Sequence, residues 1–426
     1  MDTDQNPSAA PPADPAGGAV LCSQEMAKLW PDFPPSTKNM LLTAAGRQWF
    51  DLWQSGFALA EVPAAAWGWH LRHTASPLAP PSGLRPNKRA RLSQPKMIRA
   101  LADWLHSGPL PWTDRDRARL LTAFMRRGAL DRAARRQFAH RVARAARGIA
   151  YARAREVYRD VLEETKHHCR QSVDCRGIWL PDGMLSADEI RHGLEAALRA
   201  PDAFVIKHSD IALVVRSHFL GELVVIKRHR FASTGKRLKY LWRLSRARRA
   251  WAAGIALRRL GLPAAEPLGL LETIRGGRVT DSYIITRWLP DCRTARVVAN
   301  SFHASRDRRI AMDAWRAAWL RLLDRGMYHA DTKLSNAMVQ ARDGGGSALF
   351  WTDLECVEAG APLTPYRVLR NVVQMNGSLG AEFSLRDRLY FLRGLPARWV
   401  WLRSRWCQRI IATWTARRNR HPERGP

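Results

Sequence analysis

The sequence predicts an α+β fold in which a small antiparallel sheet precedes a lobe of helices. The first observation is a series of short β-branched runs, separated by polar turns, that begins near residue 203. The second is a helical pattern beyond Pro290, with a long amphipathic segment at 306–326 that ends at Gly326. The third is a mostly helical pattern over residues 21–165, which we expect to form a separate accessory region.

Four parts follow one another along the chain. Residues 1–20 are rich in Pro, Ala, Gly and Asp, and we expect a disordered tail there. Residues 21–165 form the helical accessory domain, which is interrupted by a loop at 76–96 and carries no catalytic motif. Residues 166–395 hold the sheet and the helical lobe, and residues 396–426 form a basic C-terminal helix or tail.

The sheet is expected to have the order β-β-β-α-β-β. A basic amphipathic helix at about 240–260 separates its third and fourth strands, and Gly276-Gly277 marks the turn between the last two. The strands are predicted at 205–206, 211–215, 223–226, 268–272 and 282–286.

Composition limits the class of protein. The chain has 426 residues, with 69 Lys and Arg against 38 Asp and Glu. The net charge of +31 predicts attraction to a polyanion: a nucleic acid, an anionic membrane surface or a phosphorylated substrate. An arginine-rich composition is also typical of a GC-rich genome, so the charge does not choose among these partners.

Two further absences bear on location. No apolar run approaches the roughly 18 residues of a membrane span, and the N-terminus lacks the apolar stretch of an ordinary secretory signal, so we expect neither. The 6 cysteines include no C-x-x-C pair, which argues against a zinc ribbon or a disulfide framework and favours a reducing cytoplasm.

The stretch from Gly326 to Val339 carries the strongest chemical signal. It contains the pattern H-x-D-x-K-x-x-N between the end of a helix and a short strand. Phosphoryl transfer needs a carboxylate that orients the attacking hydroxyl and accepts its proton, and we assign this role to Asp331. Lys333 is expected to neutralise charge on the transferring phosphoryl group. His329 is expected to brace the loop through a hydrogen bond to backbone.

The remaining parts of such a site lie on both sides of this stretch. Asn336 and Asp353, the latter at the start of an Asp-Leu-Glu sequence, supply the hard oxygen ligands that Mg²⁺ prefers. Lys227 closes the strand at 223–226 and is expected to pair with the phosphates of ATP. Lys207 and Ser209 lie at the turn where a phosphate-covering loop is expected, so both are candidate nucleotide contacts.

At these residues the chain resembles the protein-kinase-like superfamily. HADTKLSN stands where H-R-D-x-K-x-x-N would, and DLE stands where D-F-G would. Within that superfamily the chain resembles the bacterial lipopolysaccharide kinases (InaA-like, including kinases of 3-deoxy-D-manno-octulosonic acid, Kdo, and of heptose). Further support comes from SRARRAW and LRRLGLPAAEPLGLLE, which precede the strand SYIITRWLP, and from the helices that begin near Val368.

The resemblance covers about residues 166–395 and implies a two-lobed protein-kinase-like fold. It also implies ATP- and Mg²⁺-dependent phosphorylation of a Kdo or heptose hydroxyl in the lipopolysaccharide inner core. The protein would then be cytoplasmic and peripheral at the cytoplasmic face of the bacterial inner membrane.

Two departures from the kinase pattern leave alternatives open. No G-x-G-x-x-G is present at the turn around Lys207, and the first acid after Lys227 is Glu266, so the usual lysine–glutamate pair with the helix cannot form. Either other groups hold Lys227 or turnover is weak. A pseudokinase, another nucleotide- or glycolipid-binding protein on this scaffold, and a small-molecule kinase of the aminoglycoside or choline type all remain possible.

The acceptor is expected to be small or a glycolipid. The segment between Asp353 and the next helix, near Tyr366, is short and has no Ala-Pro-Glu, so it offers little room for docking a peptide. Arginines would also suit an anionic leaflet. We do not expect a nucleic-acid partner, because the chain has neither an aromatic-basic motif nor zinc-ligand spacing. The sequence does not indicate an oligomeric state.

Overall fold

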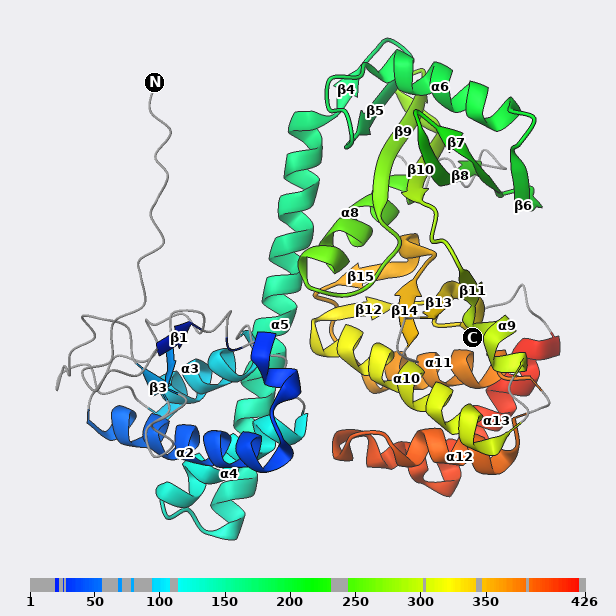
Figure 1. Cartoon of the computed structure of the whole chain (residues 1–426). Coiled ribbons are helices and arrows are strands. Elements are labelled where there is room, and N and C mark those ends of the chain that lie inside the picture. The colour runs from blue at the N-terminus through cyan, green and yellow to red at the C-terminus, as the bar shows by residue number, and fades with distance from the viewer. Residues whose placement is uncertain are drawn as a thin grey trace, which may run out of the picture. The chain divides into compact units, whose positions relative to one another are not determined.

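The computed structural model describes residues 20–22, 26, 28–55, 68–70, 78–79, 94–107, 114–230, 244–301, 304–341, 347–380 and 383–420. The chain forms two compact units, Met1–Ala150 and Tyr151–Pro426, and the boundary lies inside helix α5 (Arg132–His168) (Figure 1). The predicted tail lies outside the described residues except for Val20, which begins β1. Whether residues 166–395 fold as a domain by themselves stays a prediction.

The first unit is mainly helical, as the sequence predicts. Its core is built around Trp49, which packs against Trp104 and Phe124. Its helices are α2 (Pro35–Gln54), α3 (Gln94–Ser107), α4 (Asp114–Arg127) and the first part of α5. A small sheet of β1 (Val20–Cys22), β2 (Gly68–His70) and β3 (Leu78–Ala79) was not expected, because strands this short carry no alternating pattern.

In the second unit the last part of α5 is followed by a seven-stranded antiparallel sheet in the order β4-β5-β9-β10-β8-β7-β6. The predicted order β-β-β-α-β-β is confirmed by β6 to β8, α8 (Arg246–Arg259), β9 and β10. The strands are β6 (Phe204–Ser209), β7 (Ala212–Phe219), β8 (Glu222–Arg230), β9 (Pro267–Arg275) and β10 (Arg278–Arg287). Two strands that the sequence did not reveal, β4 (Arg170–Gln171) and β5 (Cys175–Trp179), extend the sheet beside β9.

The two faces of this sheet have different partners. Helix α6 (Ala187–Arg199) covers one face, where Ile190 and Leu194 pack with Val224 and Ile226. The opposite face carries Lys227, and α8 packs against part of it. Strand register therefore decides which side chains share the face of Lys227.

The helical lobe follows the sheet in the chain. It contains α9 (Ala295–Asn300), α10 (Ser305–Asp324), α11 (Pro365–Ser378), α12 (Leu385–Arg393) and α13 (Arg405–Arg420). Two small sheets lie within it. They are formed by β11 (Cys292–Thr294), β13 (Ala337–Ala341) and β14 (Ser347–Trp351), and by β12 (Met327–His329) with β15 (Val357–Ala359).

One core joins these helices. It includes Trp319 and Trp351, and the C-terminal segment contributes Leu402 and Ile411 to it. The predicted α+β fold with a sheet lobe and a helical lobe is therefore confirmed. None of the helices in the described part of the chain has the length and hydropathy of a membrane span.

Candidate active site

The loop that follows β12 is fixed by a buried histidine. Helix α10 ends just before Gly326, whose φ of +74° turns the chain into β12, and His329 closes that strand. His329 is fully buried; its Nδ1 accepts the N–H of Asp331 at 3.1 Å and its Nε2 donates to the carbonyl of Thr352 at 2.9 Å. Burial lowers the pKa of His329, so the ring is neutral. The expected hydrogen bonding of His329 to backbone is present.

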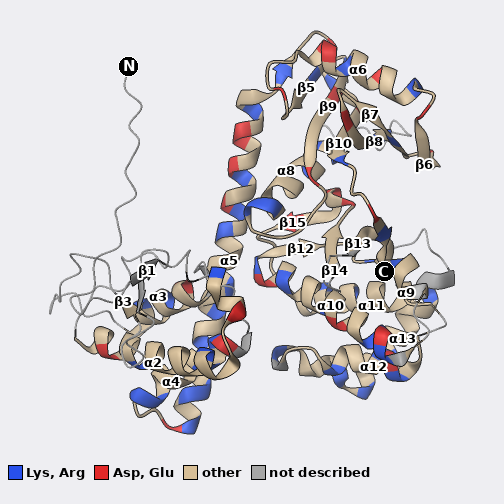
Figure 2. Ribbon diagram, viewed as in Figure 1, with Lys and Arg blue, Asp and Glu red and all other residues tan. Residues whose placement is uncertain are grey.

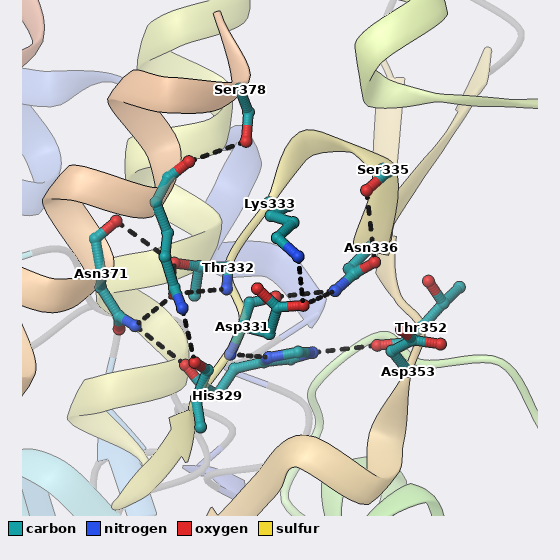
Figure 3. A network of polar contacts seen from close by, with 12 residues as sticks. His329, Asp331, Thr332, Lys333, Ser335, Asn336, Thr352, Asp353, Asn371 and Ser378 are labelled. Atoms are coloured by element: carbon teal, nitrogen blue, oxygen red, sulfur yellow. Dashed lines mark hydrogen bonds and ion pairs between the residues drawn. The ribbon is translucent and has the colours of Figure 1, made fainter. Parts of the chain in front are cut away.

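Asp331 lies at the centre of this loop. Lys333 Nζ is 3.1 Å from Asp331 Oδ2, and Asn336 Nδ2 donates to the same oxygen at 3.0 Å (Figure 3). Asn336 Nδ2 also donates to the Asp331 carbonyl at 2.9 Å. Because its nitrogen is used twice on Asp331, the Oδ1 atom of Asn336 faces away from that carboxylate.

Lys227 joins the sheet lobe to the helical lobe. Its Nζ lies 2.5 Å from Asp353 Oδ1 and 2.6 Å from Glu355 Oε1. The side chain of Lys227 is 17% exposed, and burial alone would lower its pKa, but the charges of Glu355 and Asp353 outweigh burial and raise it. Lys227 is therefore a charged ammonium that two carboxylates hold in place.

Asp353 follows β14 in the left-handed region, with φ of 52° and ψ of 45°. Aspartate tolerates this conformation better than most residues, and backbone of this kind is common at functional sites. Burial would raise the pKa of Asp353, but Lys227 outweighs it and holds the pKa below its ordinary value. The carboxylate is thus ionised and suited to a cation.

Sequence reasoning missed Glu355 as the partner of Lys227. The usual partner was sought on the helix after Lys227, where no acid occurs. In the structure the acid comes from the last position of the Asp-Leu-Glu sequence, and Glu355 is only 12% exposed. Its place beside Asp353 was the available signal.

Two polar residues of α11 were also missed. Gln374 Oε1 accepts the N–H of Thr332 at 3.0 Å, and Gln374 Nε2 donates to the Ala330 carbonyl at 2.8 Å. Asn371 Nδ2 donates to the His329 carbonyl at 3.0 Å. An Asn and a Gln at i and i+3 among buried apolar residues of a helix were the signal, because buried amides need partners. They hold the loop on both sides of Asp331.

Helix α8 is fixed without Lys227. Arg248 on α8 donates to Glu272 of β9 at 2.8 Å, and Arg176 of β5 donates to the same oxygen at 2.6 Å. Glu272 is fully buried. In the usual lysine–glutamate pair the positive side chain is on the sheet and the acid is on the helix. Here the arginine is on the helix and the glutamate is on the sheet.

His229, two residues beyond Lys227, lies in the same region. It is 1% exposed, and neither ring nitrogen has a hydrogen-bond partner among the described residues. Burial and the nearby ammonium of Lys227 lower its pKa to about 3. His229 is therefore a neutral, buried group on the same face of β8 as Lys227, and its Nε2 lies 3.9 Å from Glu355 Oε1.

Lys207 and Ser209 lie on β6, the edge strand, and not at the turn where the sequence predicted them; the turn is formed by Asp210 and Ile211. In the strand register Lys207 is opposite Val214, which is opposite Lys227, so the two lysines share one face of the sheet. The charge of Lys207 also contributes to lowering the pKa of Asp353. Ser209 Oγ bonds both the N–H and the carbonyl of Ala212, at 3.2 and 3.1 Å, and closes the turn to β7. Lys207 therefore faces the site, whereas the Ser209 hydroxyl is engaged by its own turn.

The donor set fits a magnesium-bound triphosphate. Asn336 Oδ1 and the carboxylate of Asp353 are hard oxygens, and Mg²⁺ is commonly held by one or two protein oxygens together with substrate phosphates. Lys227 and Lys207 lie on one face of the sheet, where their positive charge would suit the phosphates.

No family model matches the chain, and no curated protein matches its sequence. Among solved structures, the chain is similar to WaaP in complex with acyl carrier protein, with 18% sequence identity and a TM-score of 0.39. The similarity covers 53% of this chain and 90% of that chain. This degree of similarity does not identify an activity.

Proposed function

We propose that the chain is a phosphotransferase that transfers the γ-phosphoryl group of ATP to a sugar hydroxyl of the lipopolysaccharide inner core, on Kdo or heptose. The observation that carries this proposal is the meeting of Lys227 with Asp353 and Glu355 across the two lobes. Asp331 and Asn336 are hydrogen-bonded to each other on the loop that leads into β13, and β13 pairs with β14, the strand that precedes Asp353. Each of these side chains has the chemistry that phosphoryl transfer needs.

Asp331 is the base in this proposal. The acceptor oxygen forms a bond to the γ-phosphorus, the bond from that phosphorus to the β-bridging oxygen breaks, and ADP leaves. The proton of the acceptor hydroxyl passes to the Asp331 carboxylate, which Asn336 and Lys333 hold in orientation. Lys333 also lies where it can stabilise charge on the transferring group.

Mg²⁺ would be held by Asn336 and Asp353, where it would neutralise phosphate charge and orient the triphosphate. Lys227 would pair with the α- and β-phosphates. Glu355 would keep Lys227 in position when Asp353 turns to the metal. It would thus take the role of the acid that α8 lacks.

The acceptor is proposed to be a glycolipid sugar because of the segment between Asp353 and α11. That segment forms the short helix η6 (Leu354–Cys356) and strand β15, which pairs with β12. It is thus used for packing inside the lobe, and a protein substrate would find little of it for docking. The choice of Kdo or heptose rests on the sequence resemblance, and the net charge of +31 suits a phosphorylated lipid.

The test is phosphate transfer from γ-labelled ATP to purified core oligosaccharides, with wild-type protein and Asp331→Asn. Label in a Kdo or heptose phosphate with wild type, and none with Asp331→Asn although it still binds nucleotide, is the expected result. Unchanged transfer by Asp331→Asn would refute the assignment of the base. Nucleotide binding without transfer to any acceptor would indicate a pseudokinase, and transfer only to aminoglycosides or choline would identify a small-molecule kinase.

A further inference from the structure

A basic surface with an exposed tryptophan lies at the start of α13 and in the preceding short helix η7 (Ala397–Arg403). Trp406 is 68% exposed and Val400 is 55% exposed. Arg405 and Arg409 are exposed too, and neither forms an ion pair with a described residue. We call Val400, Arg405, Trp406 and Arg409 the α13 surface; Figure 2 colours the basic residues of the chain.

The sequence around this surface contains no opposing charge. No Asp or Glu occurs between Arg388 and Pro422. Arg405 and Arg409 are one helical turn apart, so their side chains lie on the same side of α13, next to Trp406. In space, Asp324 contacts η7, where it lies 2.8 Å from Arg398 and is paired with it. The α13 surface itself has two arginines, no acid and an aromatic ring.

Packing of the lobe does not use Trp406. Trp399 is buried, and Trp401 and Trp414 pack against the core of the helical lobe. Trp406 instead leaves most of a large ring in water, where each Å² of apolar surface costs about 25 cal/mol. A tryptophan joins an apolar ring to a polar N–H, so an exposed Trp406 beside two arginines suits a boundary between apolar and wet surroundings.

We propose that the α13 surface docks on an anionic lipid bilayer. Tryptophan is favoured at the membrane–water interface, and arginine pairs with lipid phosphates. Val400 would enter the boundary of the acyl chains and lose apolar surface to water. A nucleic acid would not favour an aliphatic side chain in this way, because its bases stack on aromatic rings. A second copy of the chain would bring arginines against arginines, which opposes self-association.

This inference goes beyond phosphoryl transfer, because it assigns a membrane-facing surface and needs no turnover. The attachment would be peripheral, with a helix end lying on the bilayer. Its failure and the failure of the proposed function can therefore be separated: Asp331→Asn should bind vesicles as the wild type does.

The experiment is co-sedimentation of the full chain with vesicles of phosphatidylcholine alone or mixed with phosphatidylglycerol. We expect binding only to the mixed vesicles. Arg405→Gln/Arg409→Gln should lower the partition coefficient about 25-fold, since each basic residue at such a surface is worth about fivefold. Adding Trp406→Ala to that variant should lower the partition coefficient further. Trp406→Phe in its place should lower it less, because an aromatic ring is kept.

The matched control is Arg275→Gln/Arg278→Gln, which removes two exposed arginines at the hairpin of β9 and β10. Met184→Ala, at a side chain that is 81% exposed, controls for loss of apolar surface. Both controls should bind as the wild type does. Equal losses in the control and α13 variants, equal binding to neutral vesicles, or retention of a single-stranded RNA in place of vesicles would overturn the proposal.

Discussion

The ion pair between Lys227 and Glu355 can be tested by replacing Glu355 with Gln. Glu355 is 12% and Lys227 17% exposed, and their charged atoms are 2.6 Å apart. A hydrogen bond to a charged group is worth about 1.5–3 kcal/mol. In the free protein Lys227 keeps Asp353, so we expect the unfolding free energy to fall by about 1.5 kcal/mol, at the lower end of that range.

The effect on catalysis should be larger. When Asp353 turns to Mg²⁺, Glu355 is the remaining carboxylate on Lys227, and its loss leaves the ammonium poorly placed. We expect kcat/KM to fall about 10- to 150-fold, which corresponds to the whole range of about 1.5–3 kcal/mol. Urea denaturation measures the first quantity and steady-state phosphate transfer the second.

Glu358→Gln is the matched control, because Glu358 also pairs with a base, Arg367 at 2.8 Å, but is 46% exposed. Exposed pairs contribute little, so the unfolding free energy should change by less than about 1 kcal/mol and kcat/KM by less than about twofold. If Glu355→Gln lowers stability while kcat/KM stays unchanged, Glu355 supports the fold alone and the positioning role is wrong.

Three other substitutions test the surroundings of the site. Glu272→Gln should destabilise the protein by about 3–5 kcal/mol in urea denaturation, because it leaves Arg248 without its buried partner; a smaller loss than 1 kcal/mol would show that α8 does not depend on this pair. Gly254→Ala should lower the melting temperature, since a Cβ there would lie 2.4 Å from Pro267 Cγ, and overpacking of about 1–3 kcal/mol exceeds the helix gain of about 1 kcal/mol; an unchanged melting temperature would contradict this packing. Because the pKa of His229 is about 3 when folded and 6.5 ordinarily, the unfolded chain binds its proton first, and stability should fall below pH 6.5 by up to about 1.4 kcal/mol per unit; His229→Gln should flatten that slope, and an equal slope would remove His229 as a cause.

Much of the sheet could be predicted from sequence. Strands β6 to β10 carry β-branched runs bounded by turns, and their order around α8 follows from the chain. Strands β4 and β5 could not be predicted in the same way, because β4 has 2 residues and β5 pairs with β9, far along the chain. Short strands are specified by the partner they meet more than by their own pattern.

In the candidate site, too, contacts within one stretch of sequence could be predicted and contacts between distant stretches could not. The side chains of the loop after β12 come from one continuous stretch, so their spacing alone predicted that they meet. The partners of Lys227 come from the other lobe. The place of Glu355 two residues after Asp353 was a signal in the sequence, but its pairing with Lys227 depends on how the two lobes meet. The amides of α11 act through backbone atoms of the loop, and no residue pattern in the loop itself reveals that contact.

In the proposed mechanism, Lys227, Asn336 and Asp353 hold a magnesium-bound triphosphate. Calorimetric titration of ATP, with and without Mg²⁺, tests it in wild type and in Asp353→Asn, a variant that removes the charge while Asn still tolerates the left-handed backbone. We predict that Mg²⁺ tightens ATP binding to the wild type and that Asp353→Asn loses most of this dependence. The same magnesium dependence in both proteins, or no ATP binding to the wild type, would contradict the claim.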